Sequence, residues 1–351
     1  AKRAGAEVSN MEYVQFHPTT FQPEGARAFL LTEAMRGEGA ILRNHLGEAF
    51  AKNYDPRGEL APRDVVTRLI WSEMIRTGKP NVFLDITHKD SDWLEKRFPS
   101  IHKHLSKYGL HMGENHIPIA PGAHYHCGGV SVDLEGRTNV PGLFCAGEVA
   151  CTGLHGANRL ASTSLLEGLV WGKSLGKAVI KDGLREKHSD LGTVTPCTGE
   201  EVPQHQVDNL WARLKQAMQE YVGVIRTDNG LEEGLRLMTQ IESEAAALYR
   251  KKKSRSLASL WNATETAKLV AKAALENENS LGAHYRVAAE DPPRIYTDDE
   301  MENPWESKLF DSSSFNSVNS TCTQTFFSFY VTFRLFKCLL QLLIQFYVKQ
   351  A

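Results

Sequence analysis

The sequence has no excess of charge of either sign. Its 351 residues include 40 lysines and arginines against 42 aspartates and glutamates, which gives a net charge of −2. A chain this close to neutral offers no general electrostatic attraction to nucleic acid or to an anionic membrane surface. We therefore expect a small molecule as its partner, and neither nucleic acid nor a membrane.

Cysteines are few and unpaired in the sequence. Six occur at irregular spacings, at positions 127, 145, 151, 197, 322 and 338. Because no Cys-x-x-Cys pair is present, the pattern argues against a redox dithiol or a zinc ribbon and favours a reducing compartment.

A dinucleotide fingerprint and a recognisable start are absent as well. The nearest string to Gly-x-Gly-x-x-Gly, at residues 37–39, lacks the third glycine, so no cradle for a pyrophosphate group is expected in this chain. The chain opens at Ala1, close to a strand-like alternation at residues 7–16, without Met, signal or transit segment. We expect an amino-terminal part of a longer protein to precede it.

The composition that is present, 42% hydrophobic and 23% charged, predicts a globular protein of two or three domains. Apolar spacing and turn residues predict helices over residues 29–36, 64–76, 162–179, 207–221 and 231–248, a helical region broken by Pro99 over 85–113, and short strands over 117–149. A linker is predicted over residues 189–202, and the helices beyond it predict a small bundle.

The carboxy-terminal residues differ from the rest. Residues 326–348 are densely apolar but hold Arg334 and Lys337 near the centre. A membrane span needs about 20 apolar residues, and each central charge costs roughly 2.5–3.5 kcal/mol on insertion. A span is therefore the less favoured alternative, and we expect residues 291–351 to be an irregular tail, such as translated non-coding sequence.

The first candidate site combines residues 15–19 with residues 31–39. His17 precedes a proline, so its imidazole is expected at a strand end. Thr32, Glu33 and Arg36 share one face of a predicted short helix. The alternative is an ordinary surface salt bridge between Glu33 and Arg36.

The second candidate is Arg63, which follows the helix-starting Pro62. A cation in the first turn is disfavoured by the helix dipole, so its presence suggests an anionic partner. The alternative is an ordinary solvated arginine.

The third candidate joins residues 124–130 to residues 147–167. Gly128 and Gly129 are expected to let the backbone approach a planar ligand, and Arg159 before a Ser/Thr-capped helix predicts an anion site. A zinc site is an alternative, without the regular spacing of structural zinc sites. Its ligands would be His124, His126, Cys127 and His155.

Five motifs in these segments occur in the order of a known family. They are Gln-Phe-His-Pro-Thr, Thr-Glu-Ala-Met-Arg-Gly-Glu-Gly, Pro-Arg-Asp-Val-Val, His-Tyr-His-Cys-Gly-Gly-Val and His-Gly-Ala-Asn-Arg-Leu-Ala-Ser-Thr-Ser-Leu-Leu-Glu. Residues 11–180 thereby resemble the succinate dehydrogenase, fumarate reductase and L-aspartate oxidase flavoprotein superfamily. Cys127 and residues 152–156 are most similar to the L-aspartate oxidase branch.

The resemblance implies an α/β fold with an added α domain. The expected parts are a remnant of a glutathione-reductase-like Rossmann FAD-binding domain at residues 1–10, an α+β capping domain at 11–125, a second part of the FAD-binding domain at 126–190, a helical-bundle domain at 200–290 and the tail at 291–351.

The implied activity is FAD-dependent oxidation of L-aspartate to iminoaspartate, the first step of de novo NAD biosynthesis. Oxygen, giving hydrogen peroxide, or fumarate would accept the electrons. The alternatives are a fumarate reductase or succinate dehydrogenase flavoprotein subunit and a non-catalytic remnant that acts only as a binding surface. The implied partners are a small dicarboxylate (L-aspartate, fumarate or succinate) and quinolinate synthase. The implied location is a plastid in plants and otherwise the cytoplasm.

The resemblance also implies roles for single residues, and none of them is a metal ligand. The implied carboxylate binders are His17, Thr32, His124 and Arg159. Proton transfer is implied for Arg63, with a relay toward solvent through Glu33 and Arg36. The implied FAD contacts are Glu148 and the backbone of Ser164 and Leu165. Since arginine is a poor base at its reference pKa, Arg63 needs a cationic, partly desolvated setting, or else it mainly orients the substrate.

The sequence departs from the family pattern at two positions. His126 replaces a small polar residue and is expected to crowd the pocket or to add a donor. Leu281 replaces the arginine of a Ser-Arg-Gly segment, which puts the docking contacts of the helical domain in doubt. The preference for an amino acid over succinate stays open.

Overall fold

A computed structural model describes residues 1–23, 28–182 and 201–288, which lie in one compact unit, residues 1–296. The expected tail at 291–351, with its membrane-span alternative, and nearly all of the linker predicted at 189–202 lie outside the described residues. Among the helices of the described segments, none is long and apolar enough to cross a membrane.

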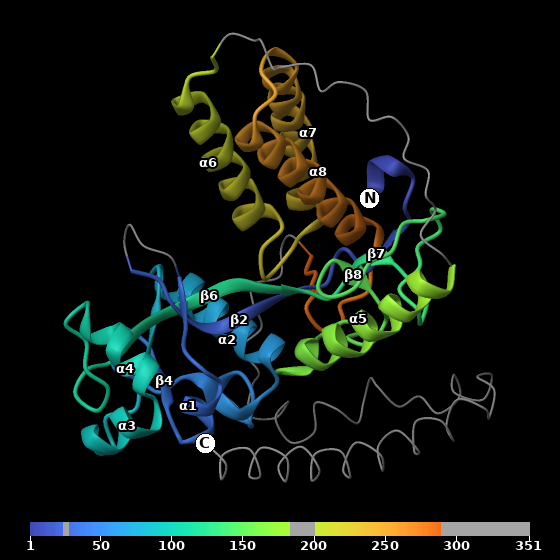
Figure 1. Ribbon diagram of the computed structural model, residues 1–351. Coiled ribbons are helices and arrows are strands. Elements are labelled where there is room, and N and C mark those ends of the chain that lie inside the picture. The colour runs from blue at the N-terminus through green and yellow to red at the C-terminus, as the bar shows by residue number, and fades with distance from the viewer. Residues whose placement is uncertain (24–27, 183–200, 289–351) are drawn as a thin grey trace, which may run out of the picture. The chain divides into compact units, whose positions relative to one another are not determined.

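A five-stranded antiparallel sheet forms the centre of the first part of the chain (Figure 1). Its strands run in the order β3-β2-β6-β5-β4, with β2 at Val14–Phe21, β3 at Phe29–Leu30, β4 at Ile41–Arg43, β5 at Val82–Asp85 and β6 at Ile117–His126. The pairing of β2 with β6 shifts register around Pro18, which cannot donate to the ladder. This irregularity lies beside His17, the strand residue that the sequence singles out.

Helices cover this sheet. The 15-residue α2 (Arg63–Thr77) packs on β2 and ends at Gly78, whose left-handed φ of 63° closes the helix. A single hydrophobic cluster joins α2 to the strands, and its fully buried members include Leu31, Met35, Leu42, Ile70, Leu84 and Ile117. The helix predicted over residues 64–76 is therefore confirmed as α2.

The helical region predicted over residues 85–113 is confirmed as α3 (Ser91–Arg97) and α4 (Pro99–Ser106). The side chain of Asp90 caps α3 by accepting the Trp93 N–H at 2.9 Å. Pro99 begins α4, because it has no N–H to lose at a first helical position.

The helix predicted over residues 29–36 is largely wrong. Phe29 and Leu30 form β3 against the end of β2, and only a single turn, α1 (Ala34–Gly37), is helical. Pairing with an existing strand thus overrides the local apolar spacing.

A second sheet has three short strands, β1 (Val8–Ser9), β7 (Gly129–Ser131) and β8 (Ala150–Cys151), in the order β1-β7-β8. A Cβ at Gly128 would lie 2.0 Å from the Asn10 carbonyl oxygen, and a Cβ at Gly129 would lie 2.3 Å from the Val149 carbonyl oxygen. Both glycines therefore allow a close approach to backbone of this chain, and their approach to a planar ligand stays a prediction. The run at residues 142–149 precedes β8 without forming a strand itself.

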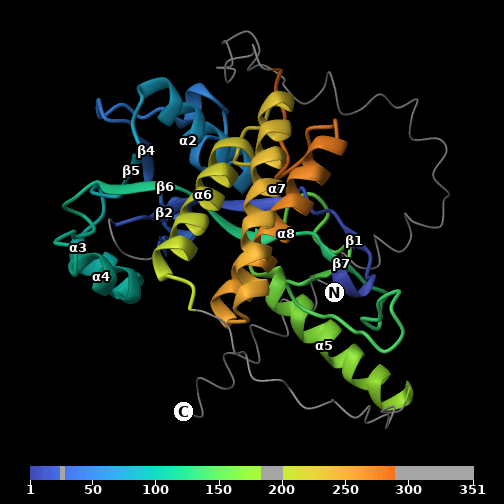
Figure 2. The same ribbon diagram turned by 90° about the horizontal axis from the view of Figure 1, so that it is seen from above.

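Four long helices complete the described fold. The helix predicted over residues 162–179 is α5 (Thr163–Asp182). The predicted bundle is α6 (Gln204–Tyr221), α7 (Asp228–Lys251) and α8 (Arg255–Glu276), whose third helix the apolar spacing did not reveal. The three lie side by side around a shared apolar cluster (Figures 1 and 2).

The remaining described elements are three single-turn 3₁₀ helices, η1 (Lys2–Ala4), η2 (Ala51–Asn53) and η3 (Gly58–Leu60).

Candidate active site

Gln15 on β2 joins the candidate residues from different parts of the chain. Its side chain is 1% exposed and lies two residues from His17, on the same side of the strand. The amide Nε2 donates to the Arg159 carbonyl oxygen at 2.7 Å, while Oε1 accepts from Arg159 Nη2 at 3.2 Å and from Arg63 Nη1 at 3.4 Å. One neutral amide therefore bridges two guanidinium groups.

Sequence reasoning missed Gln15, although it lies in the first motif. The signal that could have identified it is the two-residue period of a strand, which places positions 15 and 17 on one face.

Arg159 lies just before α5 and is almost fully buried. Its Nη2 donates to His124 Nε2 at 3.0 Å and its Nη1 to Ser164 Oγ at 3.0 Å, while the guanidinium carbon lies 4.4 Å from the Tyr125 ring centroid. Burial, and next the charge of Arg63, lower the pKa of Arg159. Its Nε has no hydrogen-bond partner among the described residues, so one donor of this cation is unused.

The two histidines of the cluster are held neutral. Burial, followed by the charge of Arg63, lowers the pKa of His17 to about 3. Burial and then Arg159 lower the pKa of His124, whose ring meets that of His17 edge-on at 5.3 Å. A neutral imidazole has one donor and one acceptor nitrogen. His17 Nδ1 is buried without a hydrogen-bond partner in the described part of the chain.

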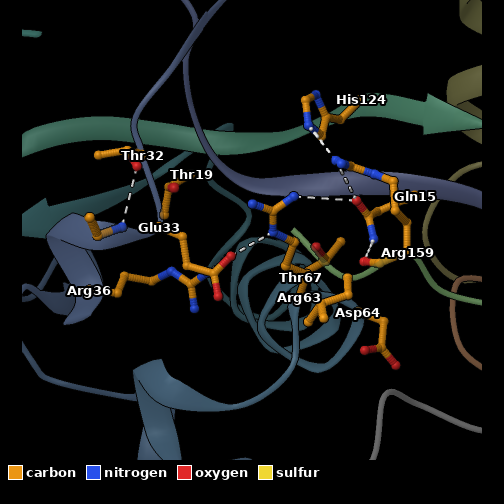
Figure 3. Close-up of polar contacts among 12 residues, drawn as sticks. Gln15, Thr19, Thr32, Glu33, Arg36, Arg63, Asp64, Thr67, His124 and Arg159 are labelled. Carbon is orange, nitrogen blue, oxygen red and sulfur yellow. Dashed lines mark hydrogen bonds and ion pairs between the residues drawn. The ribbon is translucent and has the colours of Figure 1, made fainter. Parts of the chain in front are cut away.

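Arg63, the first residue of α2, lies between Glu33 and Gln15 (Figure 3). Its Nε donates to Glu33 Oε2 at 2.7 Å, and its side chain is only 11% exposed. The alternative of an ordinary solvated arginine is therefore wrong.

Arg36 lies on the far side of Glu33, and it is not a surface residue. It is nearly fully buried, with Nη1 donating to the Glu59 carbonyl oxygen at 2.5 Å and Nη2 at 3.9 Å from Glu33 Oε2. Burial lowers its pKa. Its Nε and Nη2 make no hydrogen bond within the described segments. The alternative of a surface Glu33–Arg36 pair is wrong, since the closer partner of Glu33 is Arg63.

Thr32 is the least connected of the candidates. It is exposed, and its hydroxyl accepts the Ala34 N–H at 3.3 Å (Figure 3). Thr32 therefore lies next to Glu33 in the chain, but it makes no hydrogen bond to any arginine or histidine that the structure describes.

The assembled site is strongly cationic. Three guanidinium groups, from Arg36, Arg63 and Arg159, lie around Gln15 and the carboxylate of Glu33, which is 45% exposed. The charges of Glu59 and Glu148 also act on Arg36 and Arg159. Desolvated cations with unused donors favour a ligand that brings negative charge and several acceptors. A small dianion fits this set better than a neutral molecule.

The start of α5 fits the edge of a planar cofactor. The Ser164 N–H has no backbone acceptor among the described residues, whereas the Leu165 N–H makes a 3.3 Å bond to the Ser162 carbonyl oxygen. The Leu165 side chain is 77% exposed, and Val149 is also exposed. A free amide next to the exposed Leu165 side chain suits a flat, partly polar ring.

Glu148 and His126 contact each other. The exposed Glu148 accepts the His126 backbone N–H at 3.1 Å. His126 donates its Nε2 to the Met11 carbonyl oxygen at 3.0 Å, so this nitrogen is not the extra pocket donor that the sequence suggested.

The side chains of the zinc alternative have other partners. His124 accepts from Arg159, and His155 donates to the buried Glu167 at 2.8 Å. Burial raises the pKa of the Cys127 thiol to about 11, which keeps it from being a thiolate ligand. No group of three His, Cys, Asp or Glu side chains within the described part of the chain could hold a metal, so the zinc interpretation is wrong.

A buried polar network of Tyr125, His155 and Glu167 packs against Arg159 through the Tyr125 ring. The Tyr125 hydroxyl donates to Glu167 at 3.1 Å and lies 3.3 Å from His155 Nε2. Burial and the Glu167 charge raise the pKa of Tyr125, so the phenol stays protonated and its ring faces the guanidinium. Tyr125 and Glu167 are further residues that the sequence did not assign.

Comparisons with known proteins agree with the motifs. Residues 1–165 match the family described as FAD binding domain, and residues 211–315 match the fumarate reductase flavoprotein C-terminal family. The chain is 43% identical to the L-aspartate oxidase of Yersinia pestis over 311 residues, which cover 87% of this chain and 56% of that protein. It is 40% identical to the chloroplastic L-aspartate oxidase of Oryza sativa, over 81% of this chain and 48% of that protein.

Solved structures show the same fold. The FrdA chain of the E. coli quinol fumarate reductase matches with a TM-score of 0.68 and 28% identity, over 84% of this chain and 56% of that chain. The Mycobacterium smegmatis Sdh1 structure with UQ1 matches with a TM-score of 0.62 and 29% identity, over 83% of this chain and 52% of that chain. The chain thus spans about half the length of the relatives it matches.

Proposed function

The chain belongs to the flavoprotein superfamily of succinate dehydrogenase, fumarate reductase and L-aspartate oxidase, and from this premise we propose that the protein oxidises L-aspartate to iminoaspartate with FAD. Oxygen, which becomes hydrogen peroxide, or fumarate accepts the electrons. The reaction is the first step of de novo NAD biosynthesis, and quinolinate synthase is the proposed consumer of the product.

The main support for this proposal is the set of buried nitrogens, around Arg36, Arg63 and Arg159, that lack hydrogen-bond partners in the described part of the chain. Arg36, Arg159 and His17 each keep a buried nitrogen without a hydrogen-bond partner among the described residues. Leaving such groups unpaired costs about 1–3 kcal/mol each, and more for charged groups. A bound dicarboxylate supplies two negative charges close to these cations, and four oxygen acceptors for groups such as Arg159 and His17.

We propose that His17, His124 and Arg159 bind one end of the dicarboxylate, and that Thr32 contributes its exposed hydroxyl at the other. Arg159 is held by Gln15, Ser164 and Tyr125, so its fork is oriented before the substrate arrives. Neutral imidazoles donate hydrogen bonds without adding further charge to the cluster.

Arg63 is the proposed proton-transfer residue, with Glu33 and Arg36 as the relay. Glu33 Oε2 is 2.7 Å from Arg63 Nε, and the half-exposed Glu33 carboxylate reaches solvent. A proton can therefore pass from Arg63 to Glu33 and out of the site. The cationic, largely buried setting that the sequence argument requires for Arg63 is present.

FAD, when bound, would supply the hydride acceptor for oxidation at the substrate C2. We propose that Glu148 holds its ribose, and that the Ser164 and Leu165 amides face its pyrimidine edge. In this assignment residues 1–10 and 126–190 belong to the FAD-binding domain, residues 11–125 form the capping domain and residues 200–290 the helical domain.

The second candidate is a fumarate reductase or succinate dehydrogenase flavoprotein subunit. The observation that favours it is the fold match to the E. coli fumarate reductase chain. The identities of 39–43% to proteins named L-aspartate oxidase favour the first candidate. We propose a plastid location if the source is a plant, as for the Oryza sativa relative, and a cytoplasmic one otherwise.

The test is turnover with FAD added. The chain is assayed alone and joined to the amino-terminal half of the Yersinia pestis oxidase, with L-aspartate or succinate as substrate and with detection of hydrogen peroxide. The proposal predicts peroxide from L-aspartate and little from succinate. Faster oxidation of succinate would favour the second candidate. Failure of both proteins to bind FAD or turn over either substrate would favour a non-catalytic remnant.

A further inference from the structure

The helical part of the chain reaches the substrate site through one tight turn, residues 281–285. The Leu281 N–H donates to the His284 carbonyl oxygen at 2.8 Å, and the His284 N–H donates back to the Leu281 carbonyl oxygen at 3.0 Å. Gly282 has a left-handed φ of 56°, which favours glycine at this point. We call these five residues the clasp.

The clasp contacts the backbone next to Arg159. The Ala283 N–H donates to the Ala157 carbonyl oxygen at 2.9 Å, two residues before Arg159. A Cβ at Gly282 would lie 2.5 Å from that same oxygen. Only glycine therefore allows this approach.

The clasp also contacts α2, the helix that begins with Arg63. Arg68 Nη1 donates to the Gly282 carbonyl oxygen at 2.9 Å, and Arg68 Nη2 donates to Asp64 Oδ2 at 3.1 Å. Asp64 Oδ1 accepts from Asn158 Nδ2 at 2.8 Å. These bonds connect the clasp through Arg68 and Asp64 of α2 to Asn158, the residue before Arg159.

A buried cation holds the other side of the clasp. Arg226, in the turn between α6 and α7, is nearly fully buried, and its Nη1 donates to His284 Nδ1 at 2.7 Å and to the Glu12 carbonyl oxygen at 2.8 Å. Burial lowers the pKa of Arg226 to about 10, so it stays charged at neutral pH. His284 Nε2 donates in turn to the Asn277 carbonyl oxygen at 2.9 Å. The clasp is thus tied to both the helical bundle and the strand segment before β2.

The side chain at position 281 does not take part in this docking. Leu281 is 56% exposed, and the contacts use the backbone of Gly282 and Ala283. The family pattern has an arginine where this chain has Leu281. Because these bonds use only backbone atoms of Gly282 and Ala283, they do not depend on that arginine.

We propose that the clasp sets the position of Arg159 relative to Arg63, which makes Gly282, Arg68 and Arg226 positioning residues for the dicarboxylate. The identity of this ligand rests on the proposed function, whereas the mechanical part rests on the contacts above. The helical domain thereby takes part in substrate binding without touching the substrate.

The test compares Gly282→Ala with Gly78→Ala in the full chain. Both glycines have similar left-handed φ angles, but a Cβ at Gly78 meets no atom within 4 Å. Amide hydrogen exchange over residues 155–160 reports on the backbone beside Arg159 and needs no ligand. Exchange there rises about tenfold or more in Gly282→Ala and stays unchanged in Gly78→Ala. Unchanged exchange in Gly282→Ala overturns the proposal.

Affinity for malonate, a non-reacting dicarboxylate, supplies the second readout. Gly282→Ala weakens it about tenfold relative to Gly78→Ala, and Arg68→Lys, which keeps one donor for the Gly282 carbonyl oxygen, retains more affinity than Arg68→Leu. When Arg159 is already replaced by lysine, Gly282→Ala is expected to lower the malonate affinity by a smaller factor, because both changes act through Arg159. If the two substitutions lower the affinity independently of each other, the proposal is overturned. If the unsubstituted chain binds no malonate, the proposed function fails, and the exchange measurement still decides on the clasp.

Discussion

At the scale of single residues, the site combines buried cations with imidazoles that stay neutral. Arg63 and Arg159 both donate to Gln15, and burial, followed by the charges of these arginines, lowers the pKa of His17 and of His124. The site is thus prepared for negative charge before any ligand enters.

Arg159→Leu is expected to remove dicarboxylate binding and leave FAD binding unchanged. The substitution removes the guanidinium that contacts both His124 and Gln15, and with it the positive charge and the unused Nε donor proposed to meet the ligand. We expect the affinity for succinate, measured by titration calorimetry, to fall about 100-fold or more. Arg97→Leu, which removes an exposed partner of Glu38, is the matched control. Unchanged succinate affinity in Arg159→Leu would refute the assignment.

His17 is expected to make the protein less stable in acid. Its pKa is about 3 in the folded chain against about 6.5 when unfolded, so the unfolded chain binds the extra proton between these values. The free energy of unfolding therefore falls as the pH drops below about 6.5, by up to about 1.4 kcal/mol per pH unit from this group. Above that pH it contributes no slope.

Urea denaturation at pH 5 and at pH 7 tests this for the unsubstituted chain and for His17→Gln. The difference between the two pH values is expected to be smaller in His17→Gln. His45→Gln, a change at an exposed histidine, serves as the control. An equal difference in all three proteins would show that His17 is not held neutral.

Tyr125→Phe is expected to destabilise the buried network of Tyr125, His155 and Glu167 that packs against Arg159. It keeps the ring but removes the hydroxyl that donates to the buried Glu167. The carboxylate then loses one of its donors, at a cost of about 1–3 kcal/mol in the free energy of unfolding. Urea denaturation measures this free energy. The control is Tyr249→Phe, because the Tyr249 ring packs on Trp261. If Tyr125→Phe lowers the free energy of unfolding no more than the control does, the proposed network is contradicted.

At the scale of elements, the sequence predicted helices better than strand pairing. The periods that indicate α2, α6 and α7 are local, and Pro99 marks the break between α3 and α4. The helix expected over residues 29–36 failed because β3 gains its hydrogen bonds from β2, which no local pattern reveals. The strand period places Gln15 on the face of His17, but its bonds to Arg63 and Arg159 could not be predicted, because these partners lie more than 40 residues away along the chain.

The small sheet depends on close backbone contact, so Gly128→Ala is expected to disrupt it. The new Cβ would lie 2.0 Å from the Asn10 carbonyl oxygen, and no flexible side chain can move aside to relieve the contact. We expect a loss of about 3 kcal/mol or more in the free energy of unfolding, or failure to fold. Gly142→Ala, at an open position, is the control and is expected to lose only about 1 kcal/mol through backbone strain. Equal losses would contradict the close-contact explanation.

At the scale of the whole molecule, the candidate residues come from well-separated stretches and still form one cluster. Gln15, Glu33, Arg63, His124 and Arg159 are joined by side-chain bonds centred on Gln15 and Glu33 (Figure 3). The motifs predicted that His124, Arg63 and Arg159 act together, and the structure brings these three side chains together around Gln15. Their distances, their burial and the contact of the clasp with residue 157 follow only from the fold, because each depends on packing between distant segments.

The most direct test of the dianion site is a malonate titration followed by nuclear magnetic resonance of the arginine Nε and imidazole nitrogen signals. The signals of Arg36, Arg159 and His17 are expected to shift together, along one saturation curve, while the uncharged malonamide leaves them in place. Equal shifts with malonamide, or malonate binding that saturates without moving these three signals, would contradict a dicarboxylate site at this cluster.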